Sequence, residues 1–160
     1  MREIISLNGR WNFFKGDIKV PRPVDKGATL IQCKNVRKHI GPAAYYYFDE
    51  PDCYYAEKEM HNEGWRYVTV PHDYILLQDN DKTQNNAHGY FKYDNAWYRK
   101  EFSLDAEKYS DKRIFLQFDG VATHCEVYLN GSLMKRNFSA YNGFEIDITN
   151  NVYFDRHNVI

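Results

Sequence analysis

Short segments in which apolar and polar residues alternate constrain the fold of this chain more than any other feature of its sequence. In residues 113–119 the side chains of Ile114, Leu116 and Phe118 fall on one face, which is the pattern of a strand with one buried side. Gly, Pro, Asn and Asp residues separate further predicted strands, which lie at 65–70, 96–102, 125–129, 132–136 and 144–149. No stretch keeps a helical period over several turns. The pattern predicts an all-β fold, either a sandwich or a barrel, of about eight or more antiparallel strands.

The dipeptide Asn130-Gly131 is the strongest local turn signal in the chain. A two-residue hairpin loop of type I′ needs positive φ at both central positions, and Asn followed by Gly meets that need with little strain. We therefore predict a tight hairpin between the strands on either side. We assign Asn130 no role beyond the turn.

Length and charge narrow the classes of function. A chain of 160 residues is about one domain by size, and it can bury roughly two-thirds of its unfolded surface without disulfides or metal. The formal net charge is −1, with no basic block longer than Arg37-Lys38, which argues against nucleic acid as a partner. The sequence has no apolar run of about 18 residues, so we expect no membrane span. Because residues 1–6 lack the apolar core of a secretion signal, we expect a cytoplasmic protein.

The three cysteines, Cys33, Cys53 and Cys125, are an odd number at wide and irregular spacing. They are typical of reduced thiols, and none forms a C-x-x-C pair that would indicate zinc. We therefore expect no metal site and no cofactor in this segment. Metal use elsewhere in a full protein stays open.

A long polar connection is the first place to look for function. Pro71 cannot donate to a sheet ladder, so the strand at 65–70 has to end there or lie at an edge. Residues 77–95 then form a polar stretch before the next predicted strand begins at Ala96. Connections of this length inside a compact domain are usually functional or disordered, so we place the candidate site here.

Several blocks of sequence occur in an order that resembles a known family. They are Leu7-Asn8-Gly9-x-Trp11-x-Phe13, Trp65-x-x-Val68-x-Val70-Pro71-His72-Asp73, Ala96-Trp97-Tyr98-Arg99-Lys100-x-Phe102, Phe118-Asp119-Gly120-Val121, Val127-Tyr128-Leu129-Asn130-Gly131 and Phe144-x-x-Asp147-Ile148-Thr149. One block alone would mean little. The ordered set spans essentially the whole chain and resembles the N-terminal sugar-binding domain of glycoside hydrolase family 2, the group of β-galactosidases, β-glucuronidases and β-mannosidases.

The resemblance implies a jelly-roll β-sandwich of the galactose-binding-domain type, formed by residues 1–160 as a single domain. It also implies a longer, multidomain glycosidase, of which this chain is a piece truncated at its C-terminal end. In the family the acid/base and the nucleophile are two glutamates of a following (β/α)8 barrel, and retaining chemistry needs their carboxyl groups about 5–5.5 Å apart. We therefore expect no catalytic residue in this chain and no hydrolysis by the chain alone.

The resemblance further implies that the connection after Pro71 reaches the mouth of the barrel and helps to form the sugar pocket. The candidate substrate-binding residues are Asp73, His72, Asn85, Asn86 and His88. A carboxylate accepts hydrogen bonds from sugar hydroxyls, and a side-chain amide both donates and accepts. Two of these residues also have purely structural interpretations. Asp73 is suited to a turn that its carboxylate closes, and His72 is suited to packing within the loop.

Three functions stay open at this point. The first is an ancillary domain of a retaining glycosidase acting on a terminal β-galactoside, with the carbohydrate and the barrel of the same chain as its partners. The second is an autonomous carbohydrate-binding module that uses the Tyr-rich run 45–55. The third is a structural sandwich for subunit contacts. The choice among galactose, glucuronate and mannose, and the formation of a homo-oligomer, also stay open, because the barrel would largely set the sugar.

Overall fold

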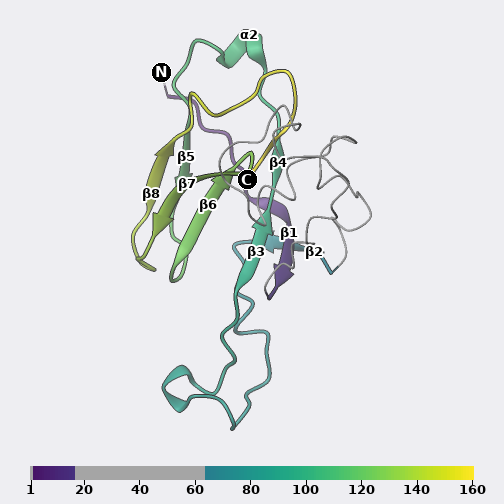
Figure 1. Ribbon diagram of the computed structural model, residues 1–160, viewed down its shortest axis with the longest axis vertical. Helices are drawn as coiled ribbons and strands as arrows, with labels where there is room; N and C mark the ends of the chain where they lie inside the picture. The colour runs from purple at the N-terminus through teal and green to yellow at the C-terminus, as the bar shows by residue number, and fades with distance from the viewer. Residues whose placement is uncertain (1, 17–63) are drawn as a thin grey trace, which may run out of the picture. The chain divides into compact units, whose positions relative to one another are not determined.

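The computed structural model of the chain describes residues 2–16 and 64–160, which form two compact units. The first unit takes its described residues from 2–16 and 64–100, and the second from 101–160. Within these residues there are nine strands, the 3-10 helix η3 (Asn86–His88) and the four-residue helix α2 (Ala106–Tyr109) (Figure 1). The strands pair antiparallel, so the predicted all-β class is confirmed.

Some sequence features lie outside the described residues. These are Cys33, Cys53, the basic pair Arg37-Lys38 and the Tyr-rich run 45–55. Among the residues that the structure does describe, no helix is long and apolar enough to cross a membrane.

The sheet of the first unit has the strand order β2–β1–β3. Its members are β1 (Gly9–Lys15), β2 (Arg66–Val70) and β3 (Ala96–Arg99). The central strand is the aromatic segment near the start of the chain, and its Phe13 lies opposite Arg66 on one side and Tyr98 on the other. Phe13 is 1% exposed, so this sheet is assembled around a side chain from the N-terminal end of the sequence.

The topology of this sheet explains part of the length of the polar connection. Because β2 and β3 both run antiparallel to β1, they are parallel to each other. Val70 at the end of β2 pairs with Gly9, whereas Ala96 at the start of β3 pairs with Lys15. The connection therefore has to run the length of β1, and parallel strands need a crossover of about a dozen residues or more.

The continuous strand predicted at 96–102 is wrong. β3 ends at Arg99, and Glu101–Phe102 form the separate strand β4, which pairs with β9 (Asn158–Val159) in the second unit. The pairing of β3 with β1 runs from Ala96 to Arg99, and its last pair joins Arg99 to Asn12. The chain therefore leaves the first sheet after Arg99, where its pairing with β1 ends. Strands commonly change sheets at such bends, and a period-2 pattern does not reveal the change.

Among the described residues, the second unit holds most of the buried apolar side chains. Strand β5 (Phe115–Phe118) pairs with β8 (Phe144–Asp147), and β6 (Cys125–Leu129) pairs with β7 (Ser132–Asn137) across a register shift at Val127 and Tyr128. The core side chains are Leu116, Val127, Leu129, Phe144, Ile146 and Ile148. The alternation that predicted these strands therefore reflects burial of one face.

The hairpin at Asn130-Gly131 forms as predicted, with φ of 51° and 77° at the two residues. The expectation that Asn130 has no role beyond the turn is wrong. Its side chain is 2% exposed, and its amide nitrogen donates to Asn158 Oδ1 at 2.9 Å and to the Asn151 carbonyl at 3.0 Å. Its amide oxygen accepts from the Val159 N–H at 2.9 Å. The turn is thus tied to the last strand, because a buried amide has to be hydrogen-bonded.

Candidate functional site

Residues 71–95 form an ordered arm, and we use that name for them below. Figure 1 shows the arm, in teal, extending away from the sheet of the first unit. The arm has an outgoing and a returning segment, which we call its two legs, and hydrogen bonds join them. Gln78 Nε2 donates to the Lys92 carbonyl at 3.1 Å, Asn80 Nδ2 to the Gly89 carbonyl at 2.7 Å, and the Asp81 N–H to the Tyr90 carbonyl at 2.9 Å. A connection this long is expected to be functional or disordered, and these hydrogen bonds show that it is ordered.

The tip of the arm is the short helix η3. Asn85 caps its N-terminus, since Oδ1 accepts from the Ala87 N–H at 2.9 Å. Gly89 ends the helix with φ of 64°, and Tyr90 follows with φ of 62°. Asn86 and His88 are exposed, and the His88 ring lies 4.6 Å from that of Tyr93. Asn85 therefore shapes the tip, whereas Asn86 is exposed beside it.

Asp73 lies at the base of the arm and closes a turn. Its Oδ1 accepts from the Ile75 N–H at 2.9 Å and from the Leu76 N–H at 3.4 Å. The residue is exposed, and a carboxylate has about four lone-pair sites on its two oxygens. The turn and a hydrogen bond to a sugar hydroxyl are therefore compatible, because the turn uses one oxygen.

His72 is half-buried and makes a long-range contact. Its Nδ1 lies 2.8 Å from the Tyr98 hydroxyl, and its ring meets the Phe13 ring edge-on with centroids 4.9 Å apart. Burial, and secondarily the charge of Arg66, lower the pKa of His72. Burial raises the pKa of Tyr98 to about 12. The phenol therefore stays protonated and the imidazole is held toward its neutral form.

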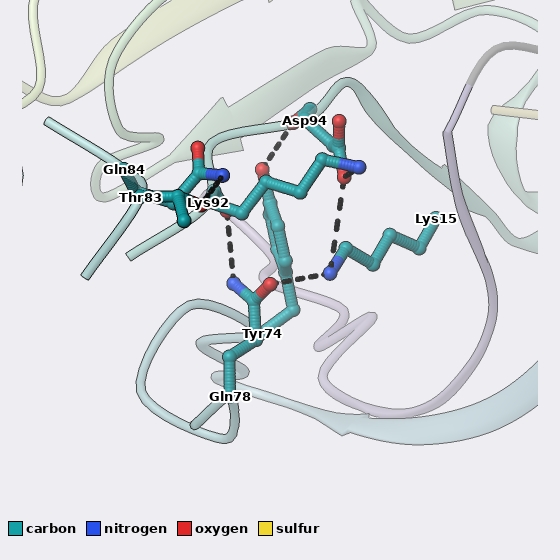
Figure 2. A network of polar contacts seen from close by, with 7 residues as sticks. All are labelled: Lys15, Tyr74, Gln78, Thr83, Gln84, Lys92 and Asp94. Carbon is teal, nitrogen blue, oxygen red and sulfur yellow. Dashed lines mark hydrogen bonds and ion pairs between the residues drawn. The ribbon is translucent and has the colours of Figure 1, made fainter. Parts of the chain in front are cut away.

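A polar network joins the arm to the end of β1. Lys15 Nζ donates to Gln78 Oε1 and lies 3.9 Å from an Asp94 carboxylate oxygen, and Lys92 Nζ lies 3.2 Å from the same oxygen. Figure 2 shows these side chains together. The Tyr74 hydroxyl donates to the Asp94 carbonyl. Both legs of the arm, one through Gln78 and the other through Asp94, are thus held by one lysine of the sheet.

The predicted site residues fall into two groups. His72 and Asp73 are at the base, and Asn85, Asn86 and His88 are at the tip, with the ladder between the legs separating the groups. Sequence reasoning missed the residues that hold the base, namely Phe13, Lys15, Tyr74, Asp94 and Tyr98. Among them only Phe13 stood in a sequence block singled out near the start of the chain, Leu7-Asn8-Gly9-x-Trp11-x-Phe13. The five residues meet only through the strand order of the sheet, which the sequence does not reveal. Within 2–16 and 64–160, no group of three or more His, Cys, Asp or Glu side chains could hold a metal ion.

Comparison with solved structures defines the class of the fold. A glycosyl hydrolase family 2 member from Bacteroides cellulosilyticus matches with a TM-score of 0.60 and 23% identity, covering 97% of this chain and 16% of that one. The predicted jelly-roll β-sandwich is thereby confirmed. The class that this likeness defines is a β-sandwich domain, which corresponds to 16% of the length of that family 2 protein.

Sequence comparison gives the family. A β-galactosidase of Thermoanaerobacter pseudethanolicus is 41% identical over 66 residues, which are 39% of this chain and 9% of that protein. A β-glucuronidase of Formosa agariphila is 28% identical over 102 residues, 60% of this chain and 10% of that protein. The model of the family described as glycosyl hydrolase 2 galactose-binding domain-like matches residues 52–160, and the chain belongs to that family. It spans about a tenth of the length of these two relatives.

Proposed function

We propose that this chain is the N-terminal domain of a longer family 2 glycosidase, that it supports a catalytic barrel of the same polypeptide, and that its arm contributes residues to the sugar pocket. The observation that carries the proposal is the family match over residues 52–160, together with an ordered arm that begins at Pro71-His72-Asp73 and holds an exposed carboxylate. A long connection stabilised by its own hydrogen bonds is suited to meeting a partner, because less ordering entropy is lost on contact.

The reaction proposed for the whole protein is hydrolysis of a terminal β-glycoside with retention of configuration. Two carboxyl groups about 5–5.5 Å apart would perform it, and we place both in the barrel. A β-galactoside is the first candidate substrate because the relative that is 41% identical is named a β-galactosidase. A β-glucuronide is the second, because another relative is named a β-glucuronidase. Assay of the complete protein on nitrophenyl β-galactoside, β-glucuronide and β-mannoside distinguishes them.

Within the arm we assign the sugar contact first to Asp73, with Asn85, Asn86, His88 and His72 as further candidates. Asp73→Asn is the sharpest test, because an asparagine keeps the side-chain oxygen that closes the turn and replaces the second carboxylate oxygen with an uncharged NH2 group, which cannot accept a hydrogen bond. We expect KM of the complete enzyme to rise about tenfold, as for the loss of a hydrogen bond to a charged group. Asp79→Asn is the matched control, since Asp79 is an exposed aspartate of the same arm. Equal kinetics for the two variants would overturn the role of Asp73.

A further inference from the structure

The backbone pairing of strand β2 ends just before Asp73, the candidate sugar contact. Val70 is the last residue of β2 and pairs with Gly9, the first residue of β1. Pro71 cannot donate to a ladder, so other contacts have to decide where the backbone goes next. The direction of the arm, and with it the place of Asp73, depends on those contacts.

One such contact is the hydrogen bond between His72, just after β2, and Tyr98, which crosses the strand between them. Tyr98 belongs to β3, and β1 lies between β2 and β3. Neighbouring strands are about 4.8 Å apart, so strands on either side of β1 are on the order of 10 Å apart. The side chains of His72 and Tyr98 bridge this distance, because His72 Nδ1 lies 2.8 Å from the Tyr98 hydroxyl.

Phe13 is the surface on which this contact is built. Its ring lies 4.9 Å from that of His72, 5.0 Å from that of Tyr98 and 5.7 Å from that of Tyr74. The first two pairs meet edge-on, at 67° and 63°, an arrangement that aromatic pairs prefer. Since Phe13 is almost completely buried, the rings around it have little freedom to move.

The direction of the hydrogen bond follows from the protonation of the two groups. Tyr98, with its raised pKa, keeps its proton, and His72 is held toward the neutral imidazole. The phenol therefore donates and Nδ1 accepts, which leaves the imidazole proton on Nε2. An acceptor at the Nδ1 position is thus the chemical feature that residue 72 supplies.

We propose that His72 is a positioning residue, and that its hydrogen bond to Tyr98 across the buried ring of Phe13 locks the base of the arm and sets the place of the Asp73 carboxylate. This inference rests on the proposed function of the arm for its catalytic consequence, though not for the lock itself. It assigns His72 and Tyr98 to one unit, in which His72 supports the sugar contact of Asp73.

The test compares two substitutions of His72 in the complete protein. His72→Asn can place its side-chain oxygen Oδ1 near the position of Nδ1 and so restore the acceptor, whereas His72→Leu cannot accept a hydrogen bond. Both substitutions remove the imidazole ring. If His72 acted only by packing its ring, the two variants would be affected equally.

The main measurement is amide hydrogen exchange at Ile75 and Leu76, whose N–H groups the Asp73 carboxylate holds. We expect exchange to accelerate about three- to tenfold in His72→Leu, the range for loss of one hydrogen bond, and to stay near the wild-type rate in His72→Asn. Tyr98→Phe, which keeps its ring against Phe13, should match His72→Leu. Tyr93→Phe is the control, because it removes a hydroxyl from a tyrosine elsewhere on the arm, and it should leave both amides unchanged.

The outcomes separate the lock from the function of the arm. Unchanged exchange in Tyr98→Phe, or equal acceleration in His72→Asn and His72→Leu, would overturn the lock. Accelerated exchange together with a raised KM in His72→Leu and Tyr98→Phe supports both the lock and the sugar contact. Accelerated exchange with kinetics unchanged in these variants and in Asp73→Asn supports the lock and overturns the proposed role of the arm in the sugar pocket.

Discussion

The arm and the β6–β7 hairpin use asparagine side chains in opposite ways. Asn85 in the arm is exposed and bonds to the backbone of Ala87, two residues away. Asn130 in the hairpin is buried and bonds to residues 21, 28 and 29 positions away along the chain. A buried amide without a partner costs far more than an exposed one, because water replaces the lost bond only at the surface. The hairpin therefore secures the fold, whereas the arm holds its own shape and keeps the Asn85 side chain at the surface.

The largest expected effect comes from removing the ring beneath the base of the arm. Phe13→Ala should lower the free energy of unfolding by about 3–5 kcal/mol, as is usual for a buried phenylalanine that leaves a cavity. Urea denaturation followed by tryptophan fluorescence measures the change. Phe138→Ala is the matched control, since Phe138 is 70% exposed, and it should alter stability by no more than about 0.5 kcal/mol. Similar losses in the two variants would contradict the central place of Phe13.

The second effect tests the buried ties of the hairpin. Asn130→Gly keeps the positive φ of the turn and removes the amide that bonds to Asn151, Asn158 and Val159. We expect a loss of about 2–3 kcal/mol, because at least one buried polar group loses its partner. A loss below the error of the denaturation measurement would show that water satisfies these groups.

The same type of substitution in the arm should leave global stability nearly unchanged. Asn85→Ala removes the cap of η3, and loss of a helix cap costs about 1 kcal/mol, which here falls on the tip alone. We expect faster amide exchange at Ala87 and His88 with an unaltered unfolding midpoint. A lowered midpoint would mean that the tip unfolds together with the rest of the chain.

The smallest effect is a pH dependence at the base of the arm. The pKa of His72 is lowered from its ordinary 6.5 by burial and by Arg66, against the opposing charge of Asp73. The neutral form is thus favoured in the folded state, so its contribution is complete above pH 6.5 and is lost as the pH falls toward the lowered pKa. Exchange at Ile75 and Leu76, corrected for its intrinsic pH dependence, should accelerate over that interval in the wild type. His72→Asn should not show this acceleration.

Local signals predicted the strands, and they failed where a strand changes its partner. The alternation of Ile114, Leu116 and Phe118 is a property of neighbouring residues, and β5 forms there. The division of residues 96–102 at Lys100 depends on where β1 and β9 end their pairing with each part. A period of two continues through such a point, so the pattern cannot register the break.

In the candidate site, too, the sequence predicted the location, whereas the contacts depend on the tertiary structure. Its location after Pro71 follows from a long polar connection and from the family resemblance, and the structure places an ordered arm there. The roles of Asp73, Asn85, Asn86 and His88 toward a sugar stay predictions. The cytoplasmic location inferred from residues 1–6 also stays a prediction.

The sequence by itself determined the all-β class, the Asn130-Gly131 turn and the family, because each depends on residues that are close together in the chain or on an ordered set of motifs. The segment in which to look for function stays a prediction. Only the tertiary structure decided that Asn130 meets Asn158 and that His72 meets Tyr98. These contacts join segments 28 and 26 residues apart. They exist because strand order and register bring the segments together, and hydrogen bonds act only over about 3 Å.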